Sequence, residues 1–503
     1  MITELLRQDY VLAQARAQRD WLADLKKKAA KKDAKALVAM KKYRVTPAKL
    51  DKAIATLDVA LKRAAKDKKH GKEGIYIPSN PLLCNFQTGA TKMAERKGNT
   101  TASAVKKGRR KGLNTSPTLK LKKKSKAGAP AGKGRAVVRA PFVEGEDVHY
   151  GLDGFESKLG AIFRGVHPFN KEPAQVAKTL LPLRLFVFGD WGSGLPLARE
   201  VTQRISDMLA KGDGSRMQHV IHLGDVYYCG EEHEYRNYVF PWWPQQATDN
   251  PTHIGSWSLN GNHDRYSGNF AYFDTLLANT PFQRWHADAA TGKPSSFFLI
   301  ENAHWQVFGL DTSWKLPSLA GAVFGDPTLK DYGGQNGILT PEQVRWMAKV
   351  RDPKKGCILM THHQPASSRT KDVEGQHADA AIKLMKKEGV YSQIDAWLWG
   401  HEHRGVIFKP KAERSDKVLK DAPPFCACVG HSGVPVTAKN FEAKATLPDV
   451  LWQEDRLDAS APIYDKRRII PFGFARMDLS PGEFEFVMYD HTGSTRKTVI
   501  HTR

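Results

Sequence analysis

Polar side chains that could bind metal ions follow five short apolar segments of the chain. The segments RLFVF, HVIHL, SWSLN, ILM and AWLW run into Gly189-Asp190, Gly224-Asp225, Gly261-Asn262, Thr361-His362 and Gly400-His401. Ligands of open α/β sheets sit beyond the carboxyl ends of the strands, so these side chains should gather at one edge. Carboxylate, amide and imidazole groups suit Fe, Zn or Mn. The order GDWG, GDxxY, GNHD, xxxH, GHxH therefore predicts a metal site between Asp190 and His403.

This order of motifs resembles the calcineurin-like metallophosphoesterase superfamily, and within it the purple acid phosphatases, over residues from about 183 to 410. In the wider superfamily the first motif is Asp-x-His, whereas Gly192 stands at its third position here, as in the purple acid phosphatases. That branch carries a tyrosine three residues after the second aspartate, and Tyr228 occupies this position. The resemblance does not extend to residues 1–150.

The resemblance implies two metal ions with Asp225 bridging them. It assigns one ion to Asp190, Asp225, Tyr228 and His403, and the other to Asp225, Asn262, His362 and His401. A phenolate binds trivalent ions strongly, which favours Fe(III) at the first site, with Fe, Zn or Mn at the second. Two alternatives stay open, because Tyr228 could pack beside Tyr227 without binding metal, and a one-residue slip would exchange His362 with His363.

Two such ions would make the chain a hydrolase of phosphate esters, either a phosphatase or a phosphodiesterase. Cations about 3.5 to 4 Å apart can hold a phosphoryl oxygen, and a metal-bound hydroxide can attack phosphorus in line. The resemblance gives His263 the role of protonating the leaving oxygen or stabilising the transition state, with Asp264 orienting its ring. His363 and His431 are candidates for substrate contact. The purple acid phosphatase pattern makes the expected activity acid phosphatase-like.

Other chemically active side chains are expected to serve the core. His222 lies inside HVIHLGD and reads as a core histidine. Cys426 and Cys428 could bind a soft metal, but two cysteines on one face of a strand more often pack. Trp191, Trp242 and Trp243 could form a substrate wall, although buried aromatic residues need no function to explain them.

The elements that must position the site alternate between apolar strands and helical stretches such as LAREVTQRISDMLAKG and PEQVRWMAKVR. This alternation predicts an α/β domain. The C-terminal segment from Phe472 instead predicts two or three antiparallel strands, with turns at Pro481-Gly482 and Thr492-Gly493. By the resemblance, the fold is a sandwich of two mixed β-sheets flanked by helices.

The N-terminal third has a different organisation. Apolar spacing predicts a helix over residues 3 to about 43, and Thr46-Pro47 begins a second helix, so a helical hairpin is expected over 1–69. Its apolar stripe is narrow, which favours a partner or a second copy of the chain. The composition of residues 70–150 predicts a basic disordered linker. The phosphoesterase domain should then span 151–503, with a motif core at 183–410 and a β-rich part at 424–503.

Nearly all of the net charge belongs to this N-terminal third. Residues 1–150 hold 36 Lys and Arg against 13 Asp and Glu, a balance of +23, while the other 353 residues hold 41 against 40. Clustered Lys and Arg attract the phosphates of nucleic acid or of acidic membranes. The alternative function is therefore a nucleic-acid-associated or membrane-associated phosphodiesterase or binding protein, targeted by residues 1–140.

The sequence also bears on the compartment. The start of the chain lacks the pattern of a secretory signal, and no apolar run approaches the ~20 residues needed to span a bilayer. The five cysteines are an odd number without framework spacing, which is typical of a reducing compartment. We expect a cytoplasmic protein, with signal-independent export as the alternative.

Overall fold

The computed structural model describes residues 8–42, 46–64, 83, 166–212, 214–244, 254–314, 337–365, 379–436, 449–457, 461–464 and 467–503. They fall into two compact units, one holding the N-terminal helices and the other the residues from 166 onward. The predicted basic linker lies, apart from residue 83, outside the described residues, and the domain boundaries given above stay predictions. No helix in these ranges is both long enough and apolar enough to cross a membrane.

The N-terminal helices are α2 (Gln8–Ala30), α3 (Ala34–Lys42) and α4 (Pro47–Ala64). The prediction of one continuous helix over residues 3 to 43 was wrong, because the chain leaves the helical path at residues 31–33. Lys32 has a φ of 58°, and the Asp33 carboxylate accepts a hydrogen bond from the Ala36 amide at 2.9 Å. Asp33 therefore acts as an N-cap and starts a new helix. The predicted start of the next helix at Pro47 is confirmed.

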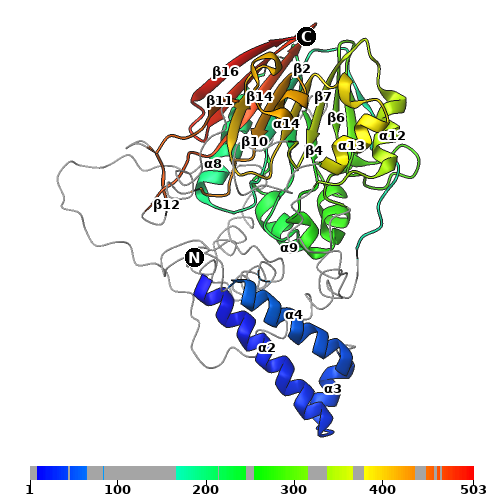
Figure 1. Cartoon of the computed structure of the whole chain (residues 1–503), viewed down its shortest axis with the longest axis vertical. Coiled ribbons are helices and arrows are strands. Elements are labelled where there is room, and N and C mark those ends of the chain that lie inside the picture. Colours follow the sequence, from blue (N-terminus) through cyan, green and yellow to red (C-terminus); the bar gives the residue numbers. More distant parts are fainter. Residues whose placement is uncertain are drawn as a thin grey trace, which may run out of the picture. The chain divides into compact units, whose positions relative to one another are not determined.

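Helices α2 and α4 pair as a hairpin, as predicted (Figure 1). Their contact buries Leu22, Leu25, Leu50 and Leu57. Across the pair, the Arg19 guanidinium donates to the Asp58 carboxylate at 3.0 Å. Exposed ion pairs of this kind contribute little, so the buried leucines hold the hairpin together.

The second unit is built on two mixed sheets, which confirms the predicted fold class (Figure 1). The larger has the order β1-β5-β6-β7-β8-β10-β9-β11, and the smaller β16-β15-β14-β2-β3-β4. The strands of the larger sheet are β1 (Ala177–Lys178), β5 (Phe298–Glu301), β6 (Trp305–Gly309), β7 (Gly356–Thr361), β8 (Ala396–Trp399), β9 (Gly405–Phe408), β10 (Phe425–Val429) and β11 (Val450–Gln453). Those of the smaller are β2 (Leu183–Phe188), β3 (Met217–His222), β4 (Ile254–Ser258), β14 (Gly473–Ser480), β15 (Glu483–Asp490) and β16 (Thr495–Thr502).

Helices and one small hairpin complete this unit. The longer helices are α8 (Pro196–Ala210), α12 (Pro341–Val350) and α13 (Asp379–Lys387). The short helical segments are α9 (Glu232–Glu234), η2 (Tyr235–Val239), η4 (Asp264–Ser267), η5 (Tyr272–Leu277), α10 (Gln283–His286), η6 (Tyr391–Gln393), η7 (Lys411–Glu413) and α14 (Lys417–Asp421). Strands β12 (Ile463–Tyr464) and β13 (Arg467–Arg468) pair antiparallel.

The main core lies between the two sheets. Alternate residues of β2 and β14, such as Leu185, Val187 and Met477, share one buried cluster with Ile358 of β7 and Leu398 of β8. The opposite face of the larger sheet is buried under α12 and α13 in a second cluster. Because both faces of the larger sheet are covered, its strands are continuous apolar runs, as the sequence indicated.

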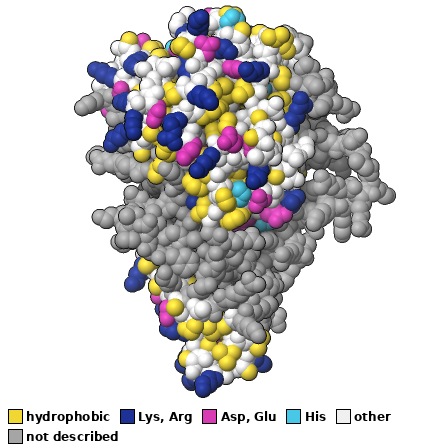
Figure 2. Space-filling view, turned by 90° about the vertical axis from the view of Figure 1, so that its right-hand side faces the viewer, with side chains coloured by type: hydrophobic (Ala, Val, Ile, Leu, Met, Phe, Trp, Pro, Cys, Tyr) yellow, Lys and Arg dark blue, Asp and Glu magenta, His cyan; other side chains and the backbone are white. Residues whose placement is uncertain are grey.

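Each of the five ligand-bearing segments contains a strand of the expected kind. Strands β2, β3 and β4 run parallel in one sheet, and β7 and β8 run parallel in the other. The predicted antiparallel C-terminal strands are also confirmed as β14, β15 and β16. On the face seen in Figure 2, Lys and Arg are interspersed with Asp and Glu over this unit. That mixture agrees with the nearly balanced charge of the sequence after residue 150.

Candidate metal centre

Four of the expected ligands sit on residues with an unusual backbone conformation. Among the described residues, six that are not glycine have a positive φ, and Asp190, Asp225, His401 and His403 are four of these, at 53° to 67°. Asp and His tolerate this left-handed region better than most residues. The chain therefore turns sharply just after β2, β3 and β8, at the strand ends where the sequence placed the ligands.

Glycines allow these turns to approach one another closely. A Cβ added at Gly224 would lie 2.6 Å from the His362 ring, and one added at Gly400 would lie 2.6 Å from Asp190 Oδ2. At Gly261 an added Cβ would collide with the amide and carboxylate of Asp225. Glycine at these three positions therefore permits the close approach of neighbouring segments.

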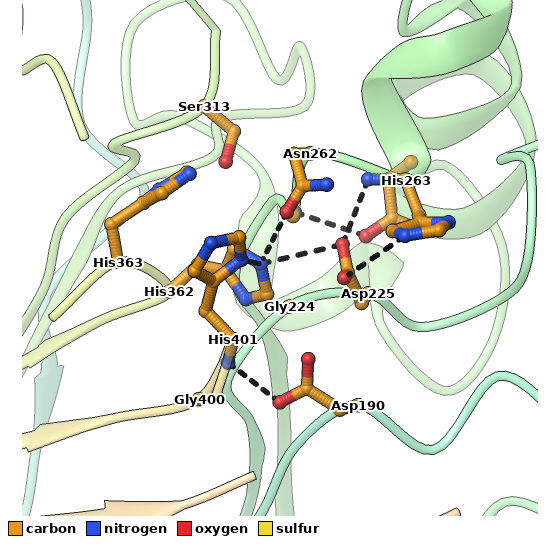
Figure 3. A network of polar contacts seen from close by, with 12 residues as sticks. Asp190, Gly224, Asp225, Asn262, His263, Ser313, His362, His363, Gly400 and His401 are labelled. Atoms are coloured by element: carbon orange, nitrogen blue, oxygen red, sulfur yellow. Dashed lines mark hydrogen bonds and ion pairs between the residues drawn. The ribbon is translucent and has the colours of Figure 1, made fainter. Parts of the chain in front are cut away.

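Several oxygen and nitrogen atoms converge on His362 Nε2 (Figure 3). This nitrogen lies 2.9 Å from Asn262 Oδ1, 3.2 Å from His401 Nδ1 and 3.4 Å from Asp225 Oδ1. The other ring nitrogen, Nδ1, donates to the carbonyl of Leu223 at 2.9 Å, which fixes the orientation of the ring. Although burial lowers the pKa of His362, the negative charges of Asp225 and Asp190 raise it to about 9. The centre therefore favours a positive charge at this point.

Asp190 also fits a cation. Its side chain is fully buried, and Oδ2 accepts a hydrogen bond from the His401 amide at 2.7 Å. Its other oxygen, Oδ1, accepts no hydrogen bond from the described residues and lies 3.4 Å from His403 Nε2. A buried carboxylate oxygen without a donor is costly, and a metal ion would satisfy it.

Two groups of side chains have the geometry to hold an ion. In one, Asp190, Asp225 and His362 each offer a ligand atom within 4.8 Å of the others, and in the second His362, His363 and His401 do so. The structure thus brings the expected ligands Asp190, Asp225, Asn262, His362, His401 and His403 into one network. His362 belongs to both groups and His363 to one of them. Since both histidines can contribute a ligand atom, the geometry leaves open which of them is the metal ligand of the fourth motif.

His263 lies beside this network, and its ring contacts a backbone carbonyl. Its amide donates to Asp225 Oδ1 at 2.8 Å, and its ring Nδ1 lies 2.8 Å from the carbonyl oxygen of Tyr228. A carbonyl can only accept, so Nδ1 carries the proton, while Nε2 lies 3.9 Å from Asp225 Oδ2. The group that contacts Nδ1 is therefore the Tyr228 carbonyl, and a role of Asp264 in orienting this ring stays a prediction.

Asp264 instead joins the segments that follow β3 and β4. Its buried carboxylate accepts hydrogen bonds from the amides of Val226 and Gly261 at 3.1 and 3.0 Å, and from the Tyr235 hydroxyl at 2.9 Å. Burial, and then the negative charge of Asp225, raise the pKa of Asp264 to about 7. Because Val226 and Tyr235 lie on other segments, the pattern GNHD alone could not have shown this role.

The other three candidate site residues are Tyr228, His363 and His431, and each is at least partly buried. The Tyr228 ring is half-buried, 5.8 Å from the His263 ring centre to centre. His363 is buried, with Nδ1 2.8 Å from the Thr312 hydroxyl. His431 is buried against Gly405 and Gly473, where an added Cβ would come within 2.7 Å of its ring. Burial lowers the pKa of His431 to about 4, so this histidine is neutral near pH 7.

The residues expected to serve the core do so. His222 is buried, its Nδ1 accepts from the Gly224 amide at 3.1 Å, and burial lowers its pKa to about 3. Cys426 and Cys428 belong to the core cluster beneath α12 and α13. The Trp191 indole is buried and donates to the Ala198 carbonyl at 2.7 Å.

One further strand end carries polar residues that the five motifs do not include. Strand β6 ends at Gly309, and Asp311, Thr312 and Ser313 follow it at the same edge of the larger sheet as the segment after β7. Ser313 points toward the centre in Figure 3. The sequence signal was present, because WQVFG is also an apolar strand followed by polar residues.

Comparison with known proteins links this centre to one family. Residues 183–405 match the family described as calcineurin-like phosphoesterase. None of the curated proteins matches the chain. These 223 residues contain all of the expected metal ligands and His263, and end before His431.

Solved structures show weaker likeness. A purple acid phosphatase from yellow lupin (Lupinus luteus) is 14% identical over 65% of this chain and 54% of its own, with a TM-score of 0.41. The GAP50 anchor protein of the inner membrane complex of Plasmodium is 14% identical over 64% and 88%, with a TM-score of 0.40. A predicted phosphoesterase from Streptococcus pneumoniae is 8% identical over 65% and 100%, with a TM-score of 0.27. The chain thus spans about half the length of the lupin protein.

Proposed function

We propose that the protein hydrolyses phosphate esters with two metal ions, from the premise that residues 183–405 match the calcineurin-like phosphoesterase family. The observation that carries the proposal is the convergence of Asp190, Asp225, Asn262, His362 and His401, which follow strands of both sheets. We assign Asp190, Asp225, Tyr228 and His403 to one ion and Asp225, Asn262, His362 and His401 to the other.

The chain's own groups have separate tasks in this reaction. When bound, the two ions supply the positive charge that binds the phosphoryl group and activates water for in-line attack. His263 holds its Nδ1 proton against the Tyr228 carbonyl, so its Nε2 is the atom that exchanges a proton with the leaving oxygen. Asp264 keeps the segments that carry Asp225 and Asn262 at a fixed separation.

We further propose Fe(III) at the site that includes Tyr228, with Fe, Zn or Mn at the other, and an acid phosphatase-like activity. The support is chemical, because a phenolate prefers a trivalent ion and Tyr228 lies beside His263 in this centre. A coloured protein that loses its visible absorption band in Tyr228→Phe would agree with iron bound by this tyrosine. A colourless, fully active Zn or Mn enzyme would remove Tyr228 from the ligand set.

The experiment that tests the function combines metal analysis with hydrolysis of an aryl phosphate and a bis-aryl phosphate. His263→Ala should keep the metal content of the wild type and reduce kcat by about 10²-fold to 10⁴-fold, the usual contribution of a general acid. His304→Ala is a matched control, because His304 is exposed on the turn between β5 and β6. Full activity of His263→Ala would refute its role, and a metal-loaded wild type that hydrolyses no ester would refute the function.

The charge of residues 1–150 supports a second candidate, in which the same centre acts on or near a polyanion. That region holds 36 Lys and Arg against 13 Asp and Glu. Such an arm would concentrate the enzyme on nucleic acid or on acidic membranes by charge alone.

The exposed Leu37 and Val38 of α3 would suit self-association through the N-terminal helices. A cytoplasmic location stays a prediction from the cysteine pattern.

A further inference from the structure

Ser313 is a buried residue whose hydroxyl has no hydrogen-bond partner within the part of the chain that the structure describes. It follows β6 in the segment Leu310-Asp311-Thr312-Ser313, and its exposed fraction is 0%. Its Oγ forms no hydrogen bond with any of the described residues. Buried hydroxyl groups are nearly always paired, because an unpaired one costs about 1 to 3 kcal/mol. The native protein therefore keeps an unpaired hydroxyl at this point, which suggests that a ligand accepts its hydrogen bond.

The backbone around Ser313 is held in place from two sides. Gln343 of α12 accepts from the Asp311 amide at 2.7 Å and donates to the Asp311 carbonyl at 3.0 Å. The Asp311 carboxylate accepts from the amides of Ser313 and Trp314 at 2.8 and 2.9 Å, and from the Asn260 side chain at 3.2 Å. Since Asn260 stands two residues before Asn262, this carboxylate ties Ser313 to a segment of the metal centre. The position of Ser313 is thus fixed before any ligand arrives.

The direction of the hydroxyl indicates what kind of ligand it meets. In Figure 3 the Ser313 oxygen is directed into the space between His363 and Asn262. His363 is itself fixed there, because its Nδ1 and its amide both contact the Thr312 hydroxyl, at 2.8 and 3.3 Å. A ligand that binds to the proposed metal ions and also accepts a hydrogen bond from the Ser313 hydroxyl must offer several acceptor atoms. A tetrahedral phosphoryl group has this arrangement of oxygens.

We propose that Ser313 is a substrate-binding residue, whose hydroxyl donates a hydrogen bond to a non-bridging oxygen of the phosphoryl group. This inference rests on the proposed function and deepens it. Substrate and product phosphate share these oxygens, so the contact contributes equally to the binding of both. Loss of such a contact raises KM and weakens phosphate binding while kcat changes little.

The test compares Ser313→Ala with the wild type, using inorganic phosphate as the probe on metal-loaded protein. Phosphate binding, measured by calorimetry and as competitive inhibition, should weaken about tenfold, and KM should rise by a similar factor. Ser313→Thr, which keeps the hydroxyl, should recover part of the affinity. Ser206→Ala is the control, because its hydroxyl donates to the Thr202 carbonyl of α8 at 2.9 Å. Its phosphate affinity should equal that of the wild type.

Thermal unfolding separates a ligand contact from a structural role. Removing an unpaired buried hydroxyl should leave the Tm of Ser313→Ala unchanged or higher without phosphate, whereas loss of a structural contact would lower it. Unchanged phosphate affinity in Ser313→Ala, or a raised KM without weaker phosphate binding, overturns the proposal. A wild type that binds phosphate through Ser313 but hydrolyses no ester would leave this inference standing and refute the proposed function. A metal-loaded wild type that binds no phosphate refutes the inference.

Discussion

Adding one methyl group at Gly400 should strongly reduce the activity without replacing any proposed ligand. The Cβ of Gly400→Ala would lie 2.6 Å from Asp190 Oδ2, whereas ordinary van der Waals contact begins at 3.4 Å. The carboxylate must therefore move by about 0.8 Å, the difference of these two distances, or the segment after β8 must shift by as much. Movement away is obstructed, because Gly430 crowds the same oxygen from another segment, with its own added Cβ at 2.7 Å.

A shift of this size exceeds the ~0.5 Å within which a constellation of catalytic side chains must be held. Misplacement by about 1 Å can cost on the order of 10²-fold in rate. We therefore expect kcat/KM of Gly400→Ala for an aryl phosphate to fall about 100-fold. The metal content should also drop, since Asp190 Oδ1 would no longer meet its ion in the same geometry.

Gly482→Ala provides the control for this experiment. An added Cβ at Gly482 meets no atom within 4 Å, but its φ of 76° is strained for alanine. This variant should lose about 1 kcal/mol of stability and keep its activity and metals. The reasoning about Gly400 is refuted if Gly400→Ala retains full metal content and a kcat/KM within about threefold of the wild type.

Three further predictions concern stability and the N-terminal arm. Asp264→Ala should lower the free energy of unfolding in urea by about 3 to 5 kcal/mol, because the buried amides of Val226 and Gly261 and the Tyr235 hydroxyl lose their acceptor; a loss below about 1 kcal/mol would contradict this role. Although burial raises its pKa, hydrogen bonds led by those from Thr291 lower the pKa of Asp288 to about 2. In the unfolded chain the pKa of this carboxyl is about 3.9, so the stability that Asp288 contributes is complete above that pH and is lost as the pH falls toward 2. In Asp288→Asn the urea midpoint should therefore change less between pH 5 and pH 3 than in the wild type. Deleting residues 1–140 should leave aryl phosphate hydrolysis intact and abolish salt-sensitive binding to DNA or acidic vesicles, measured by cosedimentation; equal binding by both forms would remove the arm from that role.

Much of the site could be predicted from sequence because its signals are local. An apolar strand, a glycine and a ligand follow one another within a few residues at Asp190, Asp225, Asn262 and His401. Parallel strands place such ends together within each sheet, at β2, β3 and β4 and at β7 and β8, whereas the meeting of the two groups depends on how the sheets pack. The antiparallel C-terminal strands were equally local, since their turns are marked by Gly482 and Gly493.

The features that were missed depend on contacts between distant segments. The ring of His263 is held by a backbone carbonyl from the segment after β3, and a carbonyl leaves no mark in the sequence. The break between α2 and α3 depends on Asp33 capping a helix in the middle of an otherwise helical pattern. The position of Ser313 depends on Gln343, which lies thirty residues further along the chain.

The left-handed backbone at Asp190, Asp225, His401 and His403 sets a limit on how this centre can be transplanted. A non-glycine residue held in that region costs about 1 to 3 kcal/mol unless its surroundings impose it. A designer who copied the seven side chains onto another sheet would reproduce the ligand types but not these four main-chain turns. The segment to transfer is therefore each strand end with its turn and its preceding glycine. The backbone angles of a transplanted centre should be checked first.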